Sequence, residues 1–200
     1  MVDVPWFRAP ADGDPGTLNA CYVALDLPVI RGRADEVALV LDGTDHTFAR
    51  LLTEVAACAG VLCAFGVEVG DEVALGPLPA ETAVVAALAV ARVGAVASYD
   101  ESPSPSAKVR LTATDAGVVL VAGGDEVAWD VAMRAGRTDP AGCADVPGDA
   151  VLARRGDQVL PVLAALGSSV EGTSPVPEGL TLVEVVGVAV WTSQAPRPTA

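Results

Sequence analysis

The feature that most constrains how this chain folds is an alternation of short apolar runs with helix patterns in its first half. The order is strand, helix, strand, helix, strand, over residues 35–43, 48–66, 71–78, 80–94 and 95–99. Strands joined by helices pair in parallel, because each helix carries the chain back across the sheet in a right-handed crossover. We therefore expect an α/β fold with a mostly parallel sheet and flanking helices.

The two helix patterns differ in how much of their surface is apolar. In the first, Thr47 is the predicted N-cap, apolar residues follow on one face, and Gly66 ends the helix. The second, over 80–94, is apolar nearly all round, and Gly94 ends it. Because a helix without a polar face needs cover on every side, we expect this one to be buried on most sides.

The remaining patterns are weaker, and we expect residues 1–200 to form a single domain. Helices are predicted at 17–30, where Pro28 stops the helix, and at 107–117 and 125–136. Strands are predicted at 118–122, 150–156 and 180–193. Gly, Pro, Ser and Asp predict an N-terminal loop at 1–16, loops at 102–106 and 137–149, and a flexible linker at 168–179 before the last strand.

Composition and charge exclude several classes of partner. Hydrophobic residues make up 52% of the 200 residues, so the chain can build a core without a disulfide or a metal ion. The formal net charge is −14, which repels both nucleic acid and anionic membranes. The longest uncharged apolar stretches fall short of the ~18–20 residues that span a bilayer, and the N-terminus lacks a signal-peptide pattern. We expect a soluble cytoplasmic protein with no nucleic-acid or membrane partner.

Cysteine and histidine give no metal-binding pattern. The four cysteines, Cys21, Cys58, Cys63 and Cys143, contain no Cys-x-x-Cys pair, and we expect buried free thiols. His46 is the only histidine, so a tetrahedral zinc site is hard to build, and we expect His46 to be structural or exposed. The glycines at 122–126 lack the rest of a dinucleotide fingerprint and predict a plain turn. We expect no catalytic residue, no metal and no cofactor.

A family resemblance runs through residues 6–100. The segments Trp6-Phe7 with 16–26, 46–75 and 79–98 resemble, in the right order, the opening of acetyl- and propionyl-coenzyme A synthetases. These enzymes are AMP-binding, adenylate-forming ligases. The departures include Val23, where the family has Asn. The resemblance implies a partial N-terminal subdomain of such a ligase, truncated before the family's ribose-binding and adenylation residues.

The end of the sequence resembles the family's phosphate-holding loop, Y-T-S-G-T-T-G-x-P-K-G, only in its first residues. Trp191, Thr192 and Ser193 match in kind, but no glycine follows Gly187 and only Arg197 could replace the lysine. Glycines give the positive φ that aims backbone N–H groups at phosphate, and the two prolines here have no N–H to offer. We expect a degenerate loop that does not bind ATP; the alternative is a chance match in an apolar strand end.

A second match carries functional content. The segment 133–137 resembles an Arg-x-Gly-Arg sequence with which these synthetases contact coenzyme A, which implies that Arg134 and Arg137 bind coenzyme A. If the turn is helical, residues three apart face the same way and both guanidiniums can contact one phosphate. The alternative is a solvated helix end with cations at its negative pole.

Together these patterns predict a non-catalytic, acyl-CoA-synthetase-like protein. It would be a pseudoenzyme or an interaction module that docks on a full-length acyl-CoA synthetase or on a second copy of itself. Two alternatives remain open. One is a component of a split ATP-dependent acyl-CoA ligase, and the other is a coenzyme A-binding protein.

Overall fold

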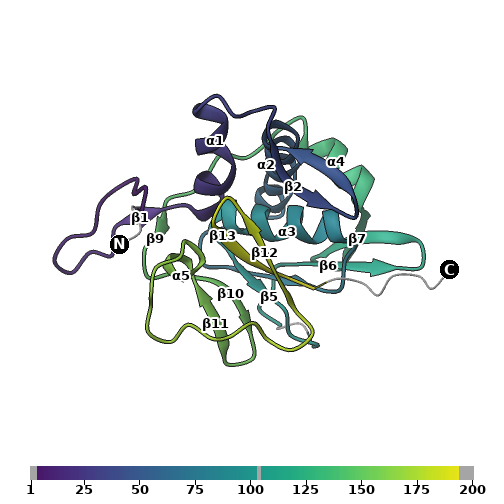
Figure 1. The fold of residues 1–200 in the computed structure, drawn as a ribbon. Coiled ribbons are helices and arrows are strands. Elements are labelled where there is room, and N and C mark those ends of the chain that lie inside the picture. The colour runs from purple at the N-terminus through teal and green to yellow at the C-terminus, as the bar shows by residue number, and fades with distance from the viewer. Residues whose placement is uncertain (1–3, 103–104, 194–200) are drawn as a thin grey trace.

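The computed structural model describes residues 4–102 and 105–193 and has the expected α/β architecture (Figure 1). Its main sheet has seven strands in the order β11-β10-β5-β4-β6-β7-β8. The four central strands β10, β5, β4 and β6 pair in parallel, and the outer pairs are antiparallel. The strands are β4 Glu72–Leu75, β5 Val96–Ser98, β6 Val109–Thr114, β7 Gly117–Ala122, β8 Asp125–Ala128, β10 Val151–Arg155 and β11 Gln158–Pro161.

Helices and three two-stranded sheets surround this main sheet. The helices are η1 Tyr22–Asp26, α1 Leu27–Ile30, α2 Phe48–Ala64, α3 Ala80–Val93, α4 Trp129–Gly136 and α5 Val162–Ala165. The small sheets pair β1 Thr17–Leu18 with β9 Val146–Pro147, β2 Val37–Leu41 with β3 Thr44–Thr47, and β12 Thr181–Val185 with β13 Val188–Thr192. Within the described residues, no helix is long and apolar enough to cross a membrane.

Helix α3 lies at the centre of the core, as its all-round apolar pattern predicts. It packs against β4 and β5 of the main sheet, against α2, and against β13 of the C-terminal hairpin. Eleven of its 14 residues are buried, including Arg92 in its last turn. Gly94 follows in the left-handed conformation, with φ 74°, and ends the helix at the predicted residue.

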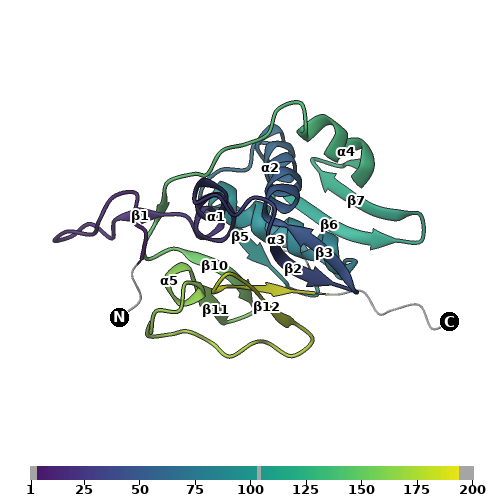
Figure 2. The ribbon, with the colours of Figure 1, turned by 45° about the horizontal axis from the view of Figure 1, so that its top comes forward.

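Helix α2 begins and ends as predicted and packs closely on α4 (Figure 2). The Thr47 Oγ1 accepts a hydrogen bond from the Arg50 N–H at 3.3 Å, which is the expected N-cap. A Cβ on Gly60 of α2 would lie 2.1 Å from the Asp139 carbonyl oxygen, and one on Gly136 of α4 would lie 2.1 Å from that of Ala57. These two glycines therefore let the backbones of α2 and the α4 segment meet.

One predicted element is wrong in kind, and two predicted strands form but pair differently from the prediction. The strand at 35–43 forms, but its Asp-Gly turn reverses the chain at once, so β2 pairs with β3 outside the main sheet. The predicted helix 107–117 is strand β6, because buried and exposed side chains alternate at its start and it pairs on both edges. The predicted strand 180–193 is a hairpin that turns at Val186 and Gly187, both with positive φ.

Two other predictions need adjustment at their boundaries. The first four residues of the predicted helix 125–136 form β8, which pairs with β7 after the predicted turn at Gly123 and Gly124. Pro28 does not stop the helix at 17–30: it stands in the first turn of α1, where a missing N–H costs little, and the helix runs to Ile30. Residues 168–179 contain no helix or strand, and their flexibility stays a prediction.

Candidate functional site

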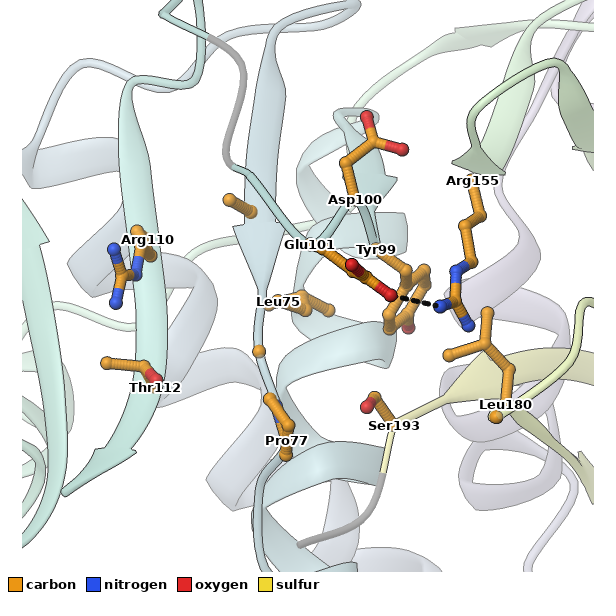
Figure 3. A pocket seen from close by; sticks show the side chains of 13 residues that line it. Leu75, Pro77, Tyr99, Asp100, Glu101, Arg110, Thr112, Arg155, Leu180 and Ser193 are labelled. Carbon is orange, nitrogen blue, oxygen red and sulfur yellow. Dashed lines mark ion pairs between the residues drawn. The ribbon is translucent and has the colours of Figure 1, made fainter.

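A cavity of about 330 Å³ lies beside the carboxyl ends of the parallel strands β4 and β5 (Figure 3). Ligands of open α/β sheets bind at this edge, because successive strand ends and the loops after them converge there. The cavity is lined by Ala74, Leu75, Gly76, Pro77, Tyr99, Asp100, Glu101, Arg110, Thr112, Arg155, Gly179, Leu180 and Ser193. We refer to it as the edge pocket.

The strand ends themselves shape the edge pocket. At the end of β4, the Gly76 N–H donates to the Leu111 carbonyl at 2.9 Å, and a Cβ on Gly76 would lie 3.0 Å from the Thr112 Oγ1. Glycine therefore allows the β4 end to lie against β6. After β5, the Tyr99 hydroxyl donates a hydrogen bond to the Trp191 carbonyl of β13. That bond ties the C-terminal hairpin to the main sheet and fixes one wall of the pocket.

The edge pocket carries charges of both signs. Arg155 Nη2 lies 3.6 Å from the Glu101 Oε1, and the two side chains face each other across one side of the cavity (Figure 3). Asp100 Oδ1 accepts a hydrogen bond from the Gly156 N–H at 2.7 Å. On the opposite wall, exposed Arg110 makes no ion pair within the described part of the chain (Figure 3). Two guanidiniums and two carboxylates thus line the same space, and their formal charges cancel.

Beneath the rim, Arg154 holds the strand ends together. Its Nε lies 2.6 Å from the Glu72 Oε1 and its Nη1 lies 3.1 Å from the Asp100 Oδ2. The hydrogen bond to Glu72, with the charges of Glu72 and Asp100, raises the pKa of Arg154 above its ordinary value. Arg154 is therefore a fixed cation that joins β10 to β4 and to the segment after β5.

Sequence reasoning found only one residue of this pocket. Ser193 lines it, and its carbonyl accepts a hydrogen bond from the Leu78 N–H at 3.0 Å. Thr192 is fully buried, and its hydroxyl lies 3.4 Å from the Thr181 carbonyl, so it faces the hairpin. Arg197 and the rest of the predicted loop lie outside the described residues. The degenerate character of that loop stays a prediction.

The two predicted coenzyme A contacts lie on another face. Arg134 is on α4, 78% exposed, with its Nη2 3.8 Å from the Asp130 carboxylate one turn earlier. Arg137 follows α4 and forms two hydrogen bonds, of 3.3 and 2.6 Å, to Glu54 on α2. Each arginine thus pairs with a different carboxylate. Arg137 also borders a surface hollow of about 510 Å³ between α2 and the segment after α4. Their contact with coenzyme A stays a prediction.

The buried-thiol prediction holds for two of the cysteines. Cys21 and Cys58 are buried, Cys143 is half-buried, and Cys63 is exposed because it lies on the outer face of α2 near its end. Burial, with the charge of Glu54, raises the pKa of the Cys58 thiol to about 12. His46 is buried on β3, with its Nδ1 3.6 Å from the Glu81 Oε1 in the first turn of α3. His46 therefore links the β2–β3 hairpin to helix α3.

Sequence reasoning missed Tyr99, Arg110 and Arg155. Tyr99 and Arg155 stand at the ends of predicted strands 95–99 and 150–156, so the rule that ligands gather at carboxyl ends could have found them. Arg110 could not be found, because its segment was expected to be a helix. Sequence reasoning also gave no sign of the cluster formed by Cys21, Asp26 and Cys143. Their sulfur and carboxylate oxygen atoms lie within 4.8 Å of one another.

Comparisons with known proteins bear on the family and the fold. The profile of the AMP-binding enzyme family matches residues 29–171. Acetyl-coenzyme A synthetase of Streptomyces coelicolor is 37% identical over 127 residues, which cover 60% of this chain and 18% of that enzyme. Acetyl-coenzyme A synthetase 2 of Kluyveromyces lactis is 34% identical over 142 residues, which cover 68% of this chain and 19% of that enzyme. The chain therefore spans less than a fifth of the length of these curated relatives.

A solved structure shows the same fold. The anthranilate CoA ligase AuaEII, in complex with anthranoyl-AMP, superposes with a TM-score of 0.52 at 14% sequence identity. The match covers 68% of this chain and 32% of that ligase. The α/β architecture is therefore that of part of an adenylate-forming ligase.

Proposed function

The chain belongs to the AMP-binding enzyme family, and we propose that it is an acyl-CoA-synthetase-like protein that does not by itself form acyl-adenylates. In this proposal the chain is a pseudoenzyme, a binding and interaction module that keeps the family's scaffold. It docks on a full-length acyl-CoA synthetase or on a second copy of itself. The activity of the curated relatives belongs to chains more than five times as long as the segment they share with this one.

The charge balance of the edge pocket carries the non-catalytic half of the proposal. A nucleoside triphosphate brings about four negative charges, and proteins hold them with backbone N–H groups, a lysine or arginine, and a helix N-terminus. Here Glu101 lies against Arg155, so one of the pocket's two cations already faces a carboxylate. The sequence after Gly187 adds no glycine and no lysine. The pocket therefore offers a triphosphate no excess of positive charge, because two carboxylates offset its two arginines.

Apolar surface supports the interaction half. On the C-terminal hairpin, Leu182 is 45% exposed and Val186 is 42% exposed, and β12 has no second pairing partner within the described residues. An exposed strand edge with large apolar side chains favours association with another chain. We expect docking to use this hairpin.

An ATP–pyrophosphate exchange assay tests the proposal. The purified chain is incubated with Mg²⁺, ATP, labelled pyrophosphate and acetate or propionate, and a full-length acetyl-CoA synthetase serves as the positive control. The expected result is no exchange above the no-protein background. Exchange by the native chain that Arg110→Ala abolishes, in a variant that stays folded, would overturn it.

The docking half has its own measurement. Analytical ultracentrifugation of the chain, alone and mixed with the synthetase, should show a second species whose population rises with concentration. Leu182→Glu is expected to weaken that association. Leu39→Glu on the other hairpin cannot serve as the control, because Leu39 packs on the core. Val40→Glu is the matched control, since Val40 is 56% exposed on β2. A strictly monomeric chain with no binding to the synthetase contradicts this half.

The similarity to acetyl-coenzyme A synthetases supports one alternative, a component of a split ATP-dependent acyl-CoA ligase. In that case a second chain supplies the residues for adenylation, and exchange appears only when both chains are present. Repeating the exchange assay with candidate complementary chains separates the two proposals. Exchange by the mixture, and by neither chain alone, favours the split ligase.

The hollow beside Arg137 favours a second alternative, coenzyme A binding. Isothermal titration with coenzyme A tests it, with Arg137→Ala and Arg134→Ala as the affected variants and Arg31→Ala as a distant surface control. Saturable heat that only the first two variants reduce supports this alternative. No heat from the native chain excludes it.

A further inference from the structure

Two cysteines far apart in the sequence meet beside Arg92. Cys21 lies at the start of the first helical segment, and Cys143 lies in the segment that follows α4. Their sulfur atoms and a carboxylate oxygen of Asp26 all lie within 4.8 Å of one another. Such a set of atoms is suited either to holding a metal ion or to forming a disulfide, and the surroundings decide between the two.

Arg92 already supplies the cation that a metal ion would bring. Its Nη1 lies 2.7 Å from the Asp26 Oδ2, 3.0 Å from the Cys143 Sγ and 3.7 Å from the Cys21 Sγ. The guanidinium is 7% exposed and also donates to the Ala141 carbonyl at 2.7 Å. A metal ion would have to expel this buried charge or sit beside it, and both are costly. The thiols are therefore better placed to react with each other than to ligate a metal ion.

The two sulfurs differ in their access to solvent. Cys21 is completely buried, whereas Cys143 is half-buried and borders a surface hollow of about 440 Å³. The exposed Cys63 lines the same hollow, so an oxidant that enters it can meet Cys63 or Cys143, and only Cys143 has the Cys21 sulfur next to it. The hydrogen bond with Cys21 and burial raise the pKa of the Cys143 thiol, while the charge of Arg92 lowers it, so Arg92 is the group that favours the reactive thiolate. A partly accessible thiol at this position has a second thiol next to it that can resolve a sulfenic acid.

We propose that Cys143 and Cys21 form a reversible redox modification site. Hydrogen peroxide oxidises the Cys143 thiol to a sulfenic acid and is reduced to water. The Cys21 sulfur then attacks the Cys143 sulfur, the S–S bond forms, the S–O bond breaks, and a second water leaves with the two protons. A small dithiol reverses the reaction by thiol–disulfide exchange. Two thiols and one peroxide thus yield one disulfide and two waters.

The surrounding structure can accommodate this bond. An S–S bond is about 2 Å long, so the sulfurs must approach, and residues 140–145, which contain no helix or strand, carry Cys143. Asp26 and the Ala141 carbonyl still satisfy Arg92 when the thiols are consumed. The disulfide would tie the N-terminal helical segment to the segment after α4. It is independent of the edge pocket and of the proposed function.

Peptide mapping after peroxide treatment tests the site. The full chain is treated with hydrogen peroxide, free thiols are blocked with N-ethylmaleimide, and peptides are separated by mass spectrometry without reduction. We expect a cross-linked peptide pair that contains Cys21 and Cys143, a mass about 2 Da below that of the separate peptides, and loss of the pair on reduction. Cys63→Ser is the matched control and should keep the pair, whereas Cys143→Ser should lose it.

A second measurement separates the two thiols. In Cys21→Ala, peroxide should leave Cys143 as a sulfenic acid that dimedone labels, because no thiol resolves it. Oxidation of the native chain should raise Tm by roughly 5–15 °C, and Cys143→Ser should show no rise. A cross-link to Cys63 instead of Cys21, a cross-link that forms only in urea, or no cross-link at all would overturn the proposal.

Discussion

Two regions of this molecule contain arginines beside carboxylates, and they are built in opposite ways. In the last turn of α3, Arg92 is buried and bonds to the Asp26 carboxylate and to the Ala141 carbonyl. At the edge pocket, Arg155 and Glu101 meet at the surface, where Glu101 is 91% exposed. The first arrangement holds segments of the chain together, while the second leaves its charges in water. The contrast is consistent with our proposal of a family scaffold that lacks a nucleotide site with an excess of positive charge.

The comparison predicts its largest effect at Arg92. Arg92→Ala removes the bidentate partner of Asp26 and leaves that half-buried carboxylate unpaired, so we expect a loss of about 3 kcal/mol in the free energy of unfolding. Urea denaturation measures it. The matched control is Arg50→Ala, whose pair with Glu81 is exposed and should contribute less than about 1 kcal/mol. Equal losses of stability in the two variants would show that the buried pair contributes no more than an exposed one.

A second prediction tests the close packing of the same region. Gly60→Ala places a methyl group where the Asp139 carbonyl lies, so α2 and the segment after α4 must separate. We expect a loss of about 2 kcal/mol, read as a lower urea midpoint at unchanged slope. Gly142→Ala serves as control, because a Cβ there meets nothing within 4 Å, and its effect should stay within about 0.5 kcal/mol. An unchanged urea midpoint in Gly60→Ala would mean that α2 and the segment after α4 do not pack this closely.

A third prediction concerns the junction between the main sheet and the hairpin. Tyr99→Phe removes the hydroxyl that donates to the Trp191 carbonyl and leaves a buried acceptor without a donor. The expected loss is about 1 kcal/mol. Tyr22→Phe is the control, because the Tyr22 ring stacks edge-on to Phe7 and its hydroxyl makes no hydrogen bond to any described residue. If both variants unfold at the same denaturant concentration, the hairpin does not depend on Tyr99.

The smallest effect is expected at the rim of the edge pocket. Glu101→Gln removes one charge of an exposed pair, and exposed pairs contribute little because water screens them. We expect a change of less than about 0.5 kcal/mol in the free energy of unfolding. A loss as large as that of Arg92→Ala would show that the rim is part of the scaffold, which would remove the contrast.

The sequence predicted the scaffold better than the site. Helices α2 and α3 and strands β4 and β5 follow from local patterns, because their apolar spacing, caps and terminal glycines agree with one another. Strand β6 was missed because its few residues also fit a short helix, and only pairing with β4 and β7 selects the strand.

The edge pocket and the thiol pair depend on contacts that no local pattern encodes. Arg110 lines the pocket because it lies on β6, the strand that the sequence pattern did not predict. The Arg92 bonds to Cys143 and Cys21 join residues 51 and 71 positions apart in the sequence. Such long-range contacts follow from the tertiary fold and not from the spacing of residues along one element.

Equilibrium binding shows most directly whether this scaffold lacks a site for nucleoside triphosphate. Isothermal titration of the full chain with a non-hydrolysable ATP analogue and Mg²⁺ is compared with the same titration of a full-length acetyl-CoA synthetase. We expect no saturable heat from the chain up to millimolar analogue, while the synthetase binds. Saturable binding by the native chain that Arg110→Ala abolishes, with Arg50→Ala unaffected, would contradict it.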